Sequence, residues 1–445
     1  MDRRGFMGIM ATGPLAKRLL PHSCGTSAPD LQERLPGGLT GSQDARIEVD
    51  LGHIGRNLAR IKGRARVPVM AVVKANAYGH GLVEVSRCLE GQGVHGLMVG
   101  KLDEAVALRD AGIKGRILNF GPFGRSDCRE IVARDICQTI TSEDALYLDE
   151  EAAQSRKKAA VDLHVDTGMN RAGVPWEKAF DLVVKLSARP HIASEGVSTT
   201  LTEDAAFNRE QVRRLVDVHR RALDRGIPLG LRHAASSAGL MQGPDFCLDM
   251  VRPGIMLYGY YANAADQSGD ALGLEPALRL LGRVTYVKNL APGESVSYHR
   301  ALVARERMRI ATVGLGYSDG YPTGSAGKGS VAIRGKLFRV VAAVTSNHLM
   351  VDLDNDPDVA HGDEAVLIDV RKGSDLTADI VAEQAGISDY RLLIGLNPLL
   401  PRVFAAKGDR RSRCDQGIYA YRLVAGRGGG MEVPGGADQG PPVRG

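Results

Sequence analysis

Residues 67–81 read VPVMAVVKANAYGHG, and this stretch sets the pattern from which we predict the fold. Its first part, Val67–Val73, is a short apolar run typical of a buried strand, and the run ends at Lys74. Comparable runs and segments with apolar residues at helical spacing follow along the chain: Arg116–Phe120 and Val161–Val165 as strands, Leu102–Ala111 and Phe207–Arg225 as helices. This alternation extends from about residue 47 to residue 258. It predicts a parallel α/β fold, and a closed TIM-like α/β barrel is the most economical form.

The pattern changes after about residue 275. Short β-rich runs then recur between Gly, Pro and Asp turns, at Val284–Val287, Arg309–Val313, Ser330–Ile333, Phe338–Val344 and Ala365–Ile368. We therefore expect an N-terminal barrel over residues 46–275 and a C-terminal, mainly β domain over residues 276–425.

The two ends of the chain differ from these domains. Asp2–Met7 resembles a twin-arginine export signal, and the mildly apolar stretch Gly8–Leu20 follows it. We therefore interpret residues 1–45 as a leader that directs export to the periplasm. The alternative is a basic, disordered tail on a cytoplasmic protein. Residues 426–445 are rich in Gly and Pro, which predicts a disordered tail.

Composition excludes several classes of protein. The 445 residues are 44% hydrophobic and 24% charged, and no apolar run is long enough to span a membrane. The net charge of +5 comes from basic residues near the two ends, without a basic stripe, so no nucleic-acid partner is expected. The six cysteines form no CxxC pair, and Pro357 stands where a calcium loop needs Gly, so no metal site is predicted.

Lys74 is the first candidate for chemistry. Residues at the carboxyl ends of barrel strands face the active site, and a lysine against an apolar wall can act as a Schiff-base amine. Position alone, however, favours an ordinary solvated lysine at the end of a strand.

The residues around Lys74 change this interpretation. Residues 72–81, VVKANAYGHG, closely resemble the segment that holds the pyridoxal-phosphate lysine in the alanine racemase family. Further segments resemble that family in the same order: 165–171 (VDTGMNR), 233–238 (HAASSA), 250–255 (MVRPGI), 296–298 (VSY) and 316–322 (GYSDGYP). The resemblance extends from about Arg46 to Phe404, across both predicted domains.

The resemblance implies a cofactor, pyridoxal 5′-phosphate, and a set of site residues. Lys74 and Tyr298 would be the two catalytic bases, acting on opposite faces of the substrate Cα as inversion requires. Tyr298 would come from a partner subunit, which implies a homodimer with shared active sites. Arg171 and Ser346 would line the substrate site. The cofactor would be bound by Lys74, Tyr78, Ser237, Arg252, Gly254 and Ile255.

Two of these roles carry a physical consequence. A tyrosine has an ordinary pKa near 10, so Tyr298 needs a cationic neighbour to act as a base, and Arg171 is the candidate. Arg252 is the residue implied at the pyridine nitrogen. Because an arginine can only donate hydrogen bonds, it would leave that nitrogen unprotonated and make the ring a weaker electron sink.

The chain also departs from the family at several positions. His164 stands where the family commonly has a lysine, and Thr200 where it usually has a histidine beneath the cofactor. Ser236 replaces an asparagine and His299 a glycine. Thr345–His348 replaces the segment that lines the substrate entrance.

We therefore predict an amino-acid racemase that interconverts L- and D-alanine and so serves D-alanine biosynthesis. Because Ser346 and Asn347 reduce bulk and charge at the entrance, a broad-specificity racemase preferring larger, for example basic, amino acids is the main alternative. A decarboxylase of the same architecture and a catalytically diverged cofactor-binding protein are the others.

Overall fold

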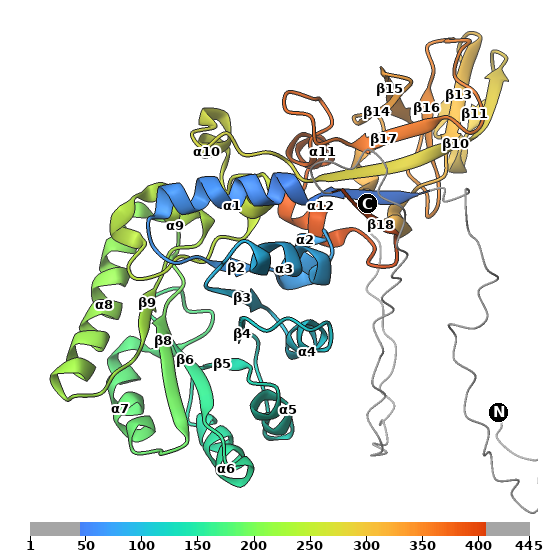
Figure 1. Cartoon of the computed structure of the whole chain (residues 1–445). Coiled ribbons are helices and arrows are strands. Elements are labelled where there is room, and N and C mark those ends of the chain that lie inside the picture. Colours follow the sequence, from blue (N-terminus) through green and yellow to red (C-terminus); the bar gives the residue numbers. More distant parts are fainter. Residues whose placement is uncertain (1–44, 406–445) are drawn as a thin grey trace, which may run out of the picture. The chain divides into compact units, whose positions relative to one another are not determined.

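A computed structural model describes residues 45–405, and Figure 1 shows the arrangement of their helices and strands. Apart from Ala45, the predicted leader lies outside the described residues, as does the predicted C-terminal tail.

The first domain is built on a parallel sheet whose strands follow one another in chain order. Its strands are β2 (Met70–Val72), β3 (Gly96–Val99), β4 (Arg116–Asn119), β5 (Cys137–Ile140), β6 (Ala159–Asp166), β8 (Ile192–Ser198) and β9 (Leu231–His233); the two-residue β7 (Val174–Pro175) pairs with β6. Every residue of β2, β3 and β5 is buried. Continuous apolar runs of this kind suit a parallel sheet because helices cover one face and the core covers the other.

The segment Asp249–Pro253 closes this sheet into a barrel. On one side, the Asp249 N–H donates to the Arg232 carbonyl at 3.0 Å. On the other, the N–H of Val251 donates to the carbonyl of Pro68 at 3.0 Å, and Met70 donates back to Val251 at 2.9 Å. Parallel bridges join this segment to β9 and to the residues before β2. The predicted α/β barrel is therefore confirmed.

Helices cover the outside of the strands (Figure 1). They are α1 (Leu51–Ala65), α3 (Leu82–Gly91), α4 (Leu102–Asp110), α5 (Cys128–Ala133), α6 (Ala145–Ser155), α7 (Trp176–Ser187), α8 (Ala205–Asp224) and α9 (Ser237–Gln242). Helix α1 illustrates the cause. The Asp50 side chain accepts from the His53 N–H at 2.9 Å and caps the first turn, while Ile54, Leu58 and Ile61 are buried along one face.

Short elements connect the larger ones. They are α2 (Lys74–Tyr78), η2 (Arg125–Asp127), η3 (Pro244–Phe246), η4 (Ile255–Tyr258), α10 (Ala264–Gly269), β11 (Ser295–Val296), η5 (Tyr298–Arg300), β12 (Leu302–Val303), η6 (Tyr317–Asp319) and η7 (Thr323–Ser325).

The second domain is an antiparallel sheet that also closes on itself. Its strands are β10 (Leu278–Leu290), β13 (Met308–Val313), β14 (Ser330–Ile333), β15 (Lys336–Val341), β16 (Leu349–Asp352) and β17 (Glu364–Ile368), with helices α11 (Ala378–Ala385) and α12 (Asp389–Gly395) after them. The order is β13-β16-β15-β14-β17-β10, and β10 pairs again with β13. Strand β10 is long and irregular in register, which lets it pair with β1, β17 and β13 in turn. The mainly β character of this domain is confirmed.

The first strand of the described chain belongs to this second sheet. We expected residues 46–50 to open the barrel domain, but β1 (Arg46–Asp50) pairs antiparallel with β10 and parallel with β18 (Arg402–Ala405). Ile47 and Val49 are fully buried, so the alternation of β1 gives it one face for the core. The two ends of the described chain therefore meet in one sheet.

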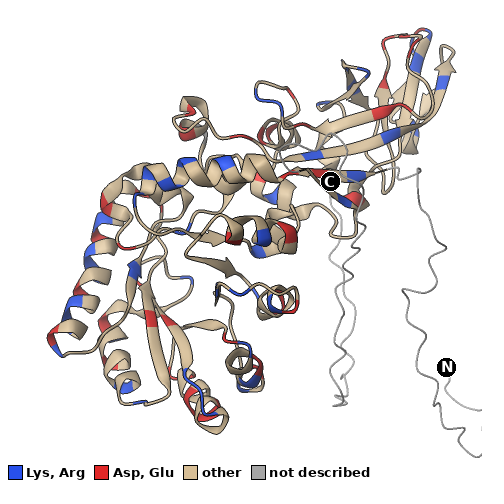
Figure 2. Cartoon of the chain, viewed as in Figure 1, with Lys and Arg blue, Asp and Glu red and all other residues tan. Residues whose placement is uncertain are grey.

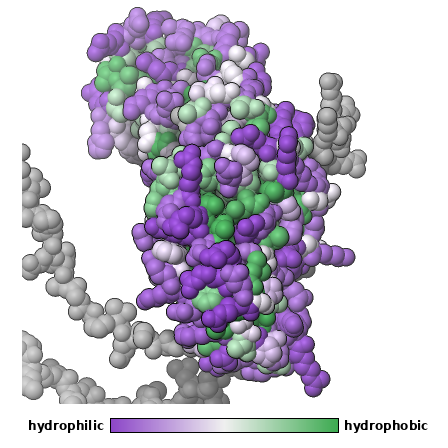
Figure 3. Space-filling model, turned by 90° about the vertical axis from the view of Figure 1, so that its left-hand side faces the viewer, coloured by the Kyte–Doolittle hydropathy of each residue, from purple (hydrophilic) through white to green (hydrophobic). Residues whose placement is uncertain are grey.

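The surface carries mixed charge. Figure 2 shows basic and acidic residues interspersed on the helices, including α8. Hydrophilic residues predominate on the face drawn in Figure 3, with smaller hydrophobic areas between them. No helix within residues 45–405 is long and apolar enough to cross a membrane, and no group of three or more potential metal ligands occurs among these residues.

Candidate active site

Lys74 lies where strand β2 gives way to an unusual turn. The segment labelled α2 is left-handed, with positive φ at Ala75, Asn76, Ala77 and Tyr78. Each non-glycine residue in this conformation costs roughly 1–2 kcal/mol, so the turn forms only where other contacts stabilise it.

Hydrogen bonds from neighbouring segments stabilise this turn. Glu104, at the start of α4, accepts from the Asn76 N–H at 3.1 Å and from the Gly100 N–H at 3.0 Å. The Asn76 side chain accepts from the Leu82 N–H at 2.8 Å. The turn is thus bonded to the first turn of α4 and to the start of α3, the helix that follows it.

The surroundings of the Lys74 amine lower its pKa. Desolvation lowers its pKa below the ordinary value, and the positive charge of Arg171 lowers it further, while Glu104 opposes both. The lysine side chain still retains exposed surface. A larger fraction of neutral amine at neutral pH is what a Schiff-base or proton-transfer role requires.

Arg171 stands at the end of a tight loop after β6. The Asp166 carboxylate accepts from the N–H groups of Gly168 at 2.9 Å and Asn170 at 3.0 Å, which fixes the loop. The Arg171 side chain is exposed and makes no hydrogen bond or ion pair within residues 45–405. Its guanidinium is therefore free to bind an anionic group beside Lys74.

A second cluster lies where β9 and the closing segment end. The Ser237 hydroxyl accepts from the Gly254 N–H at 3.0 Å. Ile255 opens the turn η4, and the N–H of the next residue, Met256, also points at the Ser237 hydroxyl at 3.5 Å. A Cβ on Gly254 would collide with the Tyr78 hydroxyl, so only glycine leaves room for that tyrosine. Two hydroxyl groups beside backbone N–H groups that point the same way suit a phosphate group.

Two aromatic rings contact the Tyr78 ring. It stacks on Tyr258 with ring centroids 4.9 Å apart, and it contacts Tyr390 of α12 at 5.9 Å. The His80 ring in turn packs against Tyr258, with ring centroids 4.6 Å apart. Burial raises the pKa of Tyr78, so its hydroxyl stays protonated and can donate. Because α12 belongs to the second domain, both domains contribute to this part of the site.

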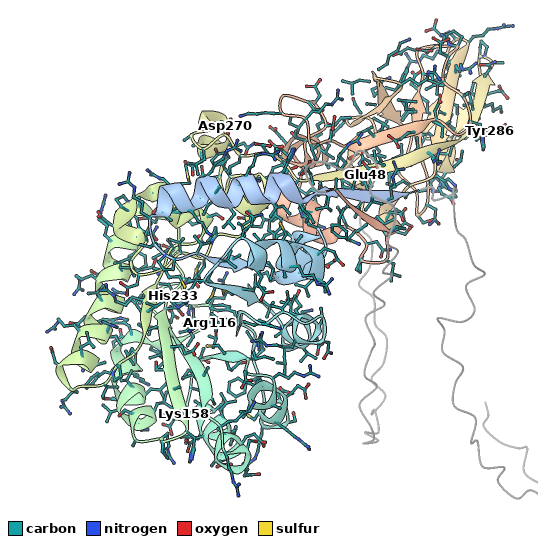
Figure 4. All side chains as sticks on the ribbon, viewed as in Figure 1. Glu48, Arg116, Lys158, His233, Asp270 and Tyr286 are labelled. Atoms are coloured by element: carbon teal, nitrogen blue, oxygen red, sulfur yellow. The ribbon has the colours of Figure 1, made fainter. Side chains whose placement is uncertain are left out.

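Arg252 is buried at the base of the site. Its Nη1 donates to His233 Nδ1 at 2.5 Å and to the His233 carbonyl at 2.7 Å. Its Nη2 donates to the carbonyls of Thr199 at 2.7 Å and Ala234 at 3.2 Å. These bonds engage both terminal nitrogens and leave the Nε–H as the remaining donor. Burial lowers the pKa of Arg252 to about 10, so it is still a cation at neutral pH. Figure 4 labels His233 on β9, and this side chain is buried.

His164 and Thr200, two of the residues that differ from the family pattern, contact each other. His164 Nε2 lies 3.4 Å from the Thr200 hydroxyl, and the edge of the His164 ring meets Phe120 with centroids 4.8 Å apart. Burial lowers the pKa of His164 to about 3, so this ring is neutral. A neutral ring here cannot bind Arg171 as an anion would.

Tyr298 lies elsewhere. It is 73% exposed on the second domain and makes no hydrogen bond or ring contact with Lys74 within residues 45–405. It lines a cavity of about 360 Å³ with Ser297, Thr345 and His348, among others. The next residue, His299, has φ +56°, a conformation that glycine would adopt without strain. The two predicted bases, Lys74 and Tyr298, therefore do not interact within residues 45–405 of one chain.

Ser346 is also remote from Lys74 within one chain. Its side chain is exposed, and its carbonyl accepts from the N–H of Ser318 at 2.9 Å and from the Ser318 hydroxyl at 2.7 Å. The Asn347 amide donates to the Ser318 hydroxyl at 3.0 Å. The segments 316–322 and 345–348 therefore lie side by side in the second domain, on the same domain as Tyr298.

Comparison with known proteins decides the family. Residues 49–262 match the model of the alanine racemase N-terminal domain, and residues 277–404 match that of the C-terminal domain. The chain belongs to the alanine racemase family. It is 34% identical over 374 residues to alanine racemase 2 of Caldanaerobacter subterraneus, which covers 82% of this chain and 95% of that protein. It is also 34% identical to the alanine racemase of Carboxydothermus hydrogenoformans, over 80% of this chain and 98% of that protein.

Solved structures of the family agree. The alanine racemase of Clostridium difficile superimposes with a TM-score of 0.79 at 30% identity, covering 83% of this chain and 97% of that one. An alanine racemase of Streptomyces lavendulae, a producer of D-cycloserine, gives 0.77 at 30% identity, with 82% and 98% coverage.

Within this alanine racemase fold, most predicted site residues share one barrel end. Lys74, Tyr78, Arg171, Ser237, Arg252, Gly254 and Ile255 all follow the carboxyl ends of barrel strands. Tyr298 and Ser346 lie apart from them, on the second domain. Sequence reasoning missed Glu104 and Tyr390. The signal for Glu104 was its place in the first turn of the helix that follows β3, at the active end of the barrel. No local pattern marked Tyr390.

Proposed function

We propose that this chain is a pyridoxal-phosphate-dependent racemase that interconverts the L and D forms of alanine. The observation that carries the proposal is the convergence of four features on one barrel end. These are the Lys74 amine with its lowered pKa, the anion-binding cluster at Ser237, the free Arg171 guanidinium and the buried donor Arg252.

These residues fit the cofactor chemically. Lys74 supplies the amine for its attachment, and Tyr78, Ser237 and the first amides of η4 suit its phosphate. The remaining Nε–H of Arg252 suits an unprotonated ring nitrogen, because arginine offers no acceptor. When bound, the cofactor supplies an electron sink for the electrons left on the substrate Cα.

The chain's own residues then handle the proton. The Lys74 amine removes a proton from Cα on one face or returns it there. Tyr298 of the second subunit does the same on the opposite face, and this exchange of faces inverts the centre. Arg171 binds the substrate carboxylate and favours the tyrosinate by its charge. Both bases are needed, since one base would return the proton to the face from which it came.

The assembly that follows is a homodimer with shared sites. Two observations support it: the separation of Tyr298 from Lys74 within one chain and the exposure of Tyr298 on the second domain. The test mixes two inactive variants, Lys74→Ala and Tyr298→Phe. A dimer with shared sites recovers about one quarter of wild-type activity after subunit exchange, because half of the dimers are mixed and each mixed dimer has one intact site. Sites complete within one subunit would recover nothing.

The reaction itself is tested by proton–deuterium exchange at Cα, followed by NMR with added cofactor and paired with chiral chromatography. We expect exchange with inversion on alanine, loss of both in Lys74→Ala, and exchange without inversion in Tyr298→Phe. The matched control is Tyr286→Phe, an equally conservative change at an exposed tyrosine of β10 (Figure 4), and it should behave as wild type. No exchange in a wild-type protein that binds the cofactor would refute the proposal. A panel of lysine, arginine, serine and methionine measures the substrate range.

For its location we propose export through the leader, on the basis of Arg3 and Arg4. Fractionation of cells that express the full chain and the variant Arg3→Lys/Arg4→Lys tests this. Wild-type protein in the periplasm and variant protein in the cytoplasm would support export, and equal cytoplasmic fractions would refute it.

A further inference from the structure

A chain of buried polar side chains crosses the interior of the barrel beneath the site. It joins strands β6, β8 and β9 to the closing segment, and its members are Arg252, His233, Asp162, Ser198, His164 and Thr200. All except Thr200 are buried, with Ser198 fully inaccessible and Asp162 only 3% exposed. Asp162 lies at the centre of this chain. Its Oδ2 contacts His233, which leads to Arg252 (the first arm). Its Oδ1 contacts Ser198, which leads to His164 and Thr200 (the second arm).

The first arm has only one consistent arrangement of protons. Arg252 can only donate, so the 2.5 Å contact of its Nη1 requires an unprotonated Nδ1 on His233. A neutral ring with a bare Nδ1 carries its proton on Nε2. That Nε2–H then donates to Asp162 Oδ2 at 2.6 Å. Asp162 must therefore be an ionised acceptor.

The second arm is equally determined. The Ser198 hydroxyl donates to Asp162 Oδ1 at 2.6 Å. Its single proton is thereby used, so Ser198 accepts from His164 Nδ1 at 3.0 Å. His164 therefore carries its proton on Nδ1, and its bare Nε2 accepts from the Thr200 hydroxyl at 3.4 Å. Every donor in both arms points toward Asp162.

We propose that Asp162 is a positioning residue that orients both arms, fixing the tautomers of His233 and His164 and holding Arg252 as a donor toward the active site. The last part rests on the proposed function, because it concerns the cofactor ring. The assignment of the histidine tautomers does not rest on the proposed function.

Charge and packing support this role. Burial alone would raise the pKa of Asp162, but His233, Ser198 and Arg252 together bring it below the ordinary value. Burial lowers the pKa values of His233 and His164, so both rings are neutral. Asp162 is the carboxylate that acts on the Arg252 cation, against the effect of its burial.

Gly196 keeps the carboxylate in place. A Cβ at this position would collide with Asp162 Oδ2 and would come within 2.9 Å of His233 Nε2. The backbone of β8 therefore packs directly against the Asp162–His233 contact. A side chain at residue 196 has no room there, so glycine is the residue that leaves the Asp162–His233 contact undisturbed.

The first test reads the histidine tautomers in the cofactor-free, full-length protein. Nitrogen-15 NMR of ring-labelled histidine distinguishes the two nitrogens, and the variants His164→Gln and His233→Gln assign the signals. We expect a neutral His233 with its proton on Nε2 and a neutral His164 with its proton on Nδ1. A proton on His233 Nδ1, a doubly protonated His233 or a proton on His164 Nε2 would overturn the proposal.

The second test compares Asp162→Asn with a matched variant, Ser198→Ala. The asparagine has one acceptor oxygen for two donors and no charge to balance Arg252, so both arms are disturbed. Ser198→Ala disconnects only the His164 arm. We expect the His164 proton to move to Nε2 in both variants. Cofactor affinity should fall about tenfold to hundredfold, with a shifted absorption band of the bound cofactor, in Asp162→Asn alone.

The outcomes separate clearly. An unshifted band and affinity in Asp162→Asn would overturn the proposal, as would equal shifts in both variants. If Asp162→Asn fails to fold, the wild-type tautomers and the Ser198→Ala spectra still decide the question. A wild-type chain that binds no cofactor would refute the proposed function, whereas the histidine spectra, recorded without cofactor, would still test Asp162.

Discussion

Two buried neutral histidines should make this protein lose stability in mild acid. His80 is fully buried, with Nδ1 2.9 Å from the Tyr78 carbonyl, and burial lowers its pKa to about 4. Burial lowers the pKa of His164 to about 3. Both groups titrate near 6.5 when the chain is unfolded. Between these values the unfolded chain binds protons that the folded chain refuses, so stability is complete above pH 6.5 and falls as the pH is lowered.

The magnitude follows from the size of the pH interval. At pH 5 the solution is about 1.5 units below the unfolded pKa and still above both folded values. Each histidine then costs about 2 kcal/mol at 1.36 kcal/mol per unit, and the two together cost about 4 kcal/mol. This is a large part of the 5–15 kcal/mol that typically separates folded from unfolded proteins. Carboxylates titrate mainly below pH 5, so this interval isolates the histidines.

Urea unfolding of the cofactor-free protein at pH 7.5 and pH 5 measures the effect. The variant His164→Gln should lose about 2 kcal/mol less than wild type between these two pH values, whatever its stability at pH 7.5. His361→Gln, at an exposed histidine of the second domain, is the control and should match wild type. An identical pH dependence in His164→Gln and wild type would show that His164 is not held neutral by burial.

Three further predictions concern the barrel end. Ala75→Gly should raise the free energy of unfolding by up to about 1 kcal/mol, because Ala75 has a left-handed backbone conformation that glycine adopts more easily. This is opposite to the usual effect of glycine, and a lower urea midpoint would contradict it. Gly254→Ala should weaken cofactor binding at least about tenfold, because the added Cβ displaces the Tyr78 hydroxyl. The same substitution should have a smaller effect on binding in a Tyr78→Phe background. Strictly additive losses of binding free energy would mean that the two residues do not interact. Glu104→Gln removes the charge that raises the pKa of Lys74, so the pH profile of cofactor attachment should move to lower pH, and a shift to higher pH would reverse the assigned sign.

The fold could be predicted where the pattern was local. The run Val67–Val73 is apolar because both faces of β2 are covered, and such patterns are visible within a few residues. The closing segment Asp249–Pro253 escaped prediction as a strand, because its bonds go to Pro68 and Arg232 and nothing in its own residues reveals them. The pairing of β1 with β18 escaped for the same reason, since it joins residues more than 350 positions apart.

The candidate site divides in the same way. Lys74, Ser237 and Arg252 were named from short motifs, which are visible in the sequence without knowledge of the distant residues that these side chains contact. Tyr390 was missed because it meets Tyr78 only through the packing of α12 on the barrel. Asp162 was missed because an acidic residue within an apolar strand has no meaning until its partners are known.

The sequence by itself determined the two domains, the family and the chemical identity of the groups at the site, because hydrophobic periodicity and short motifs are properties of the chain alone. Only the tertiary structure decided the left-handed turn that presents Lys74, the protonation pattern around Asp162 and the separation of Tyr298 from Lys74. The reason is physical: desolvation, tautomers and backbone strain depend on what surrounds a residue in space, and the residues around Asp162 come from four separate segments of the barrel.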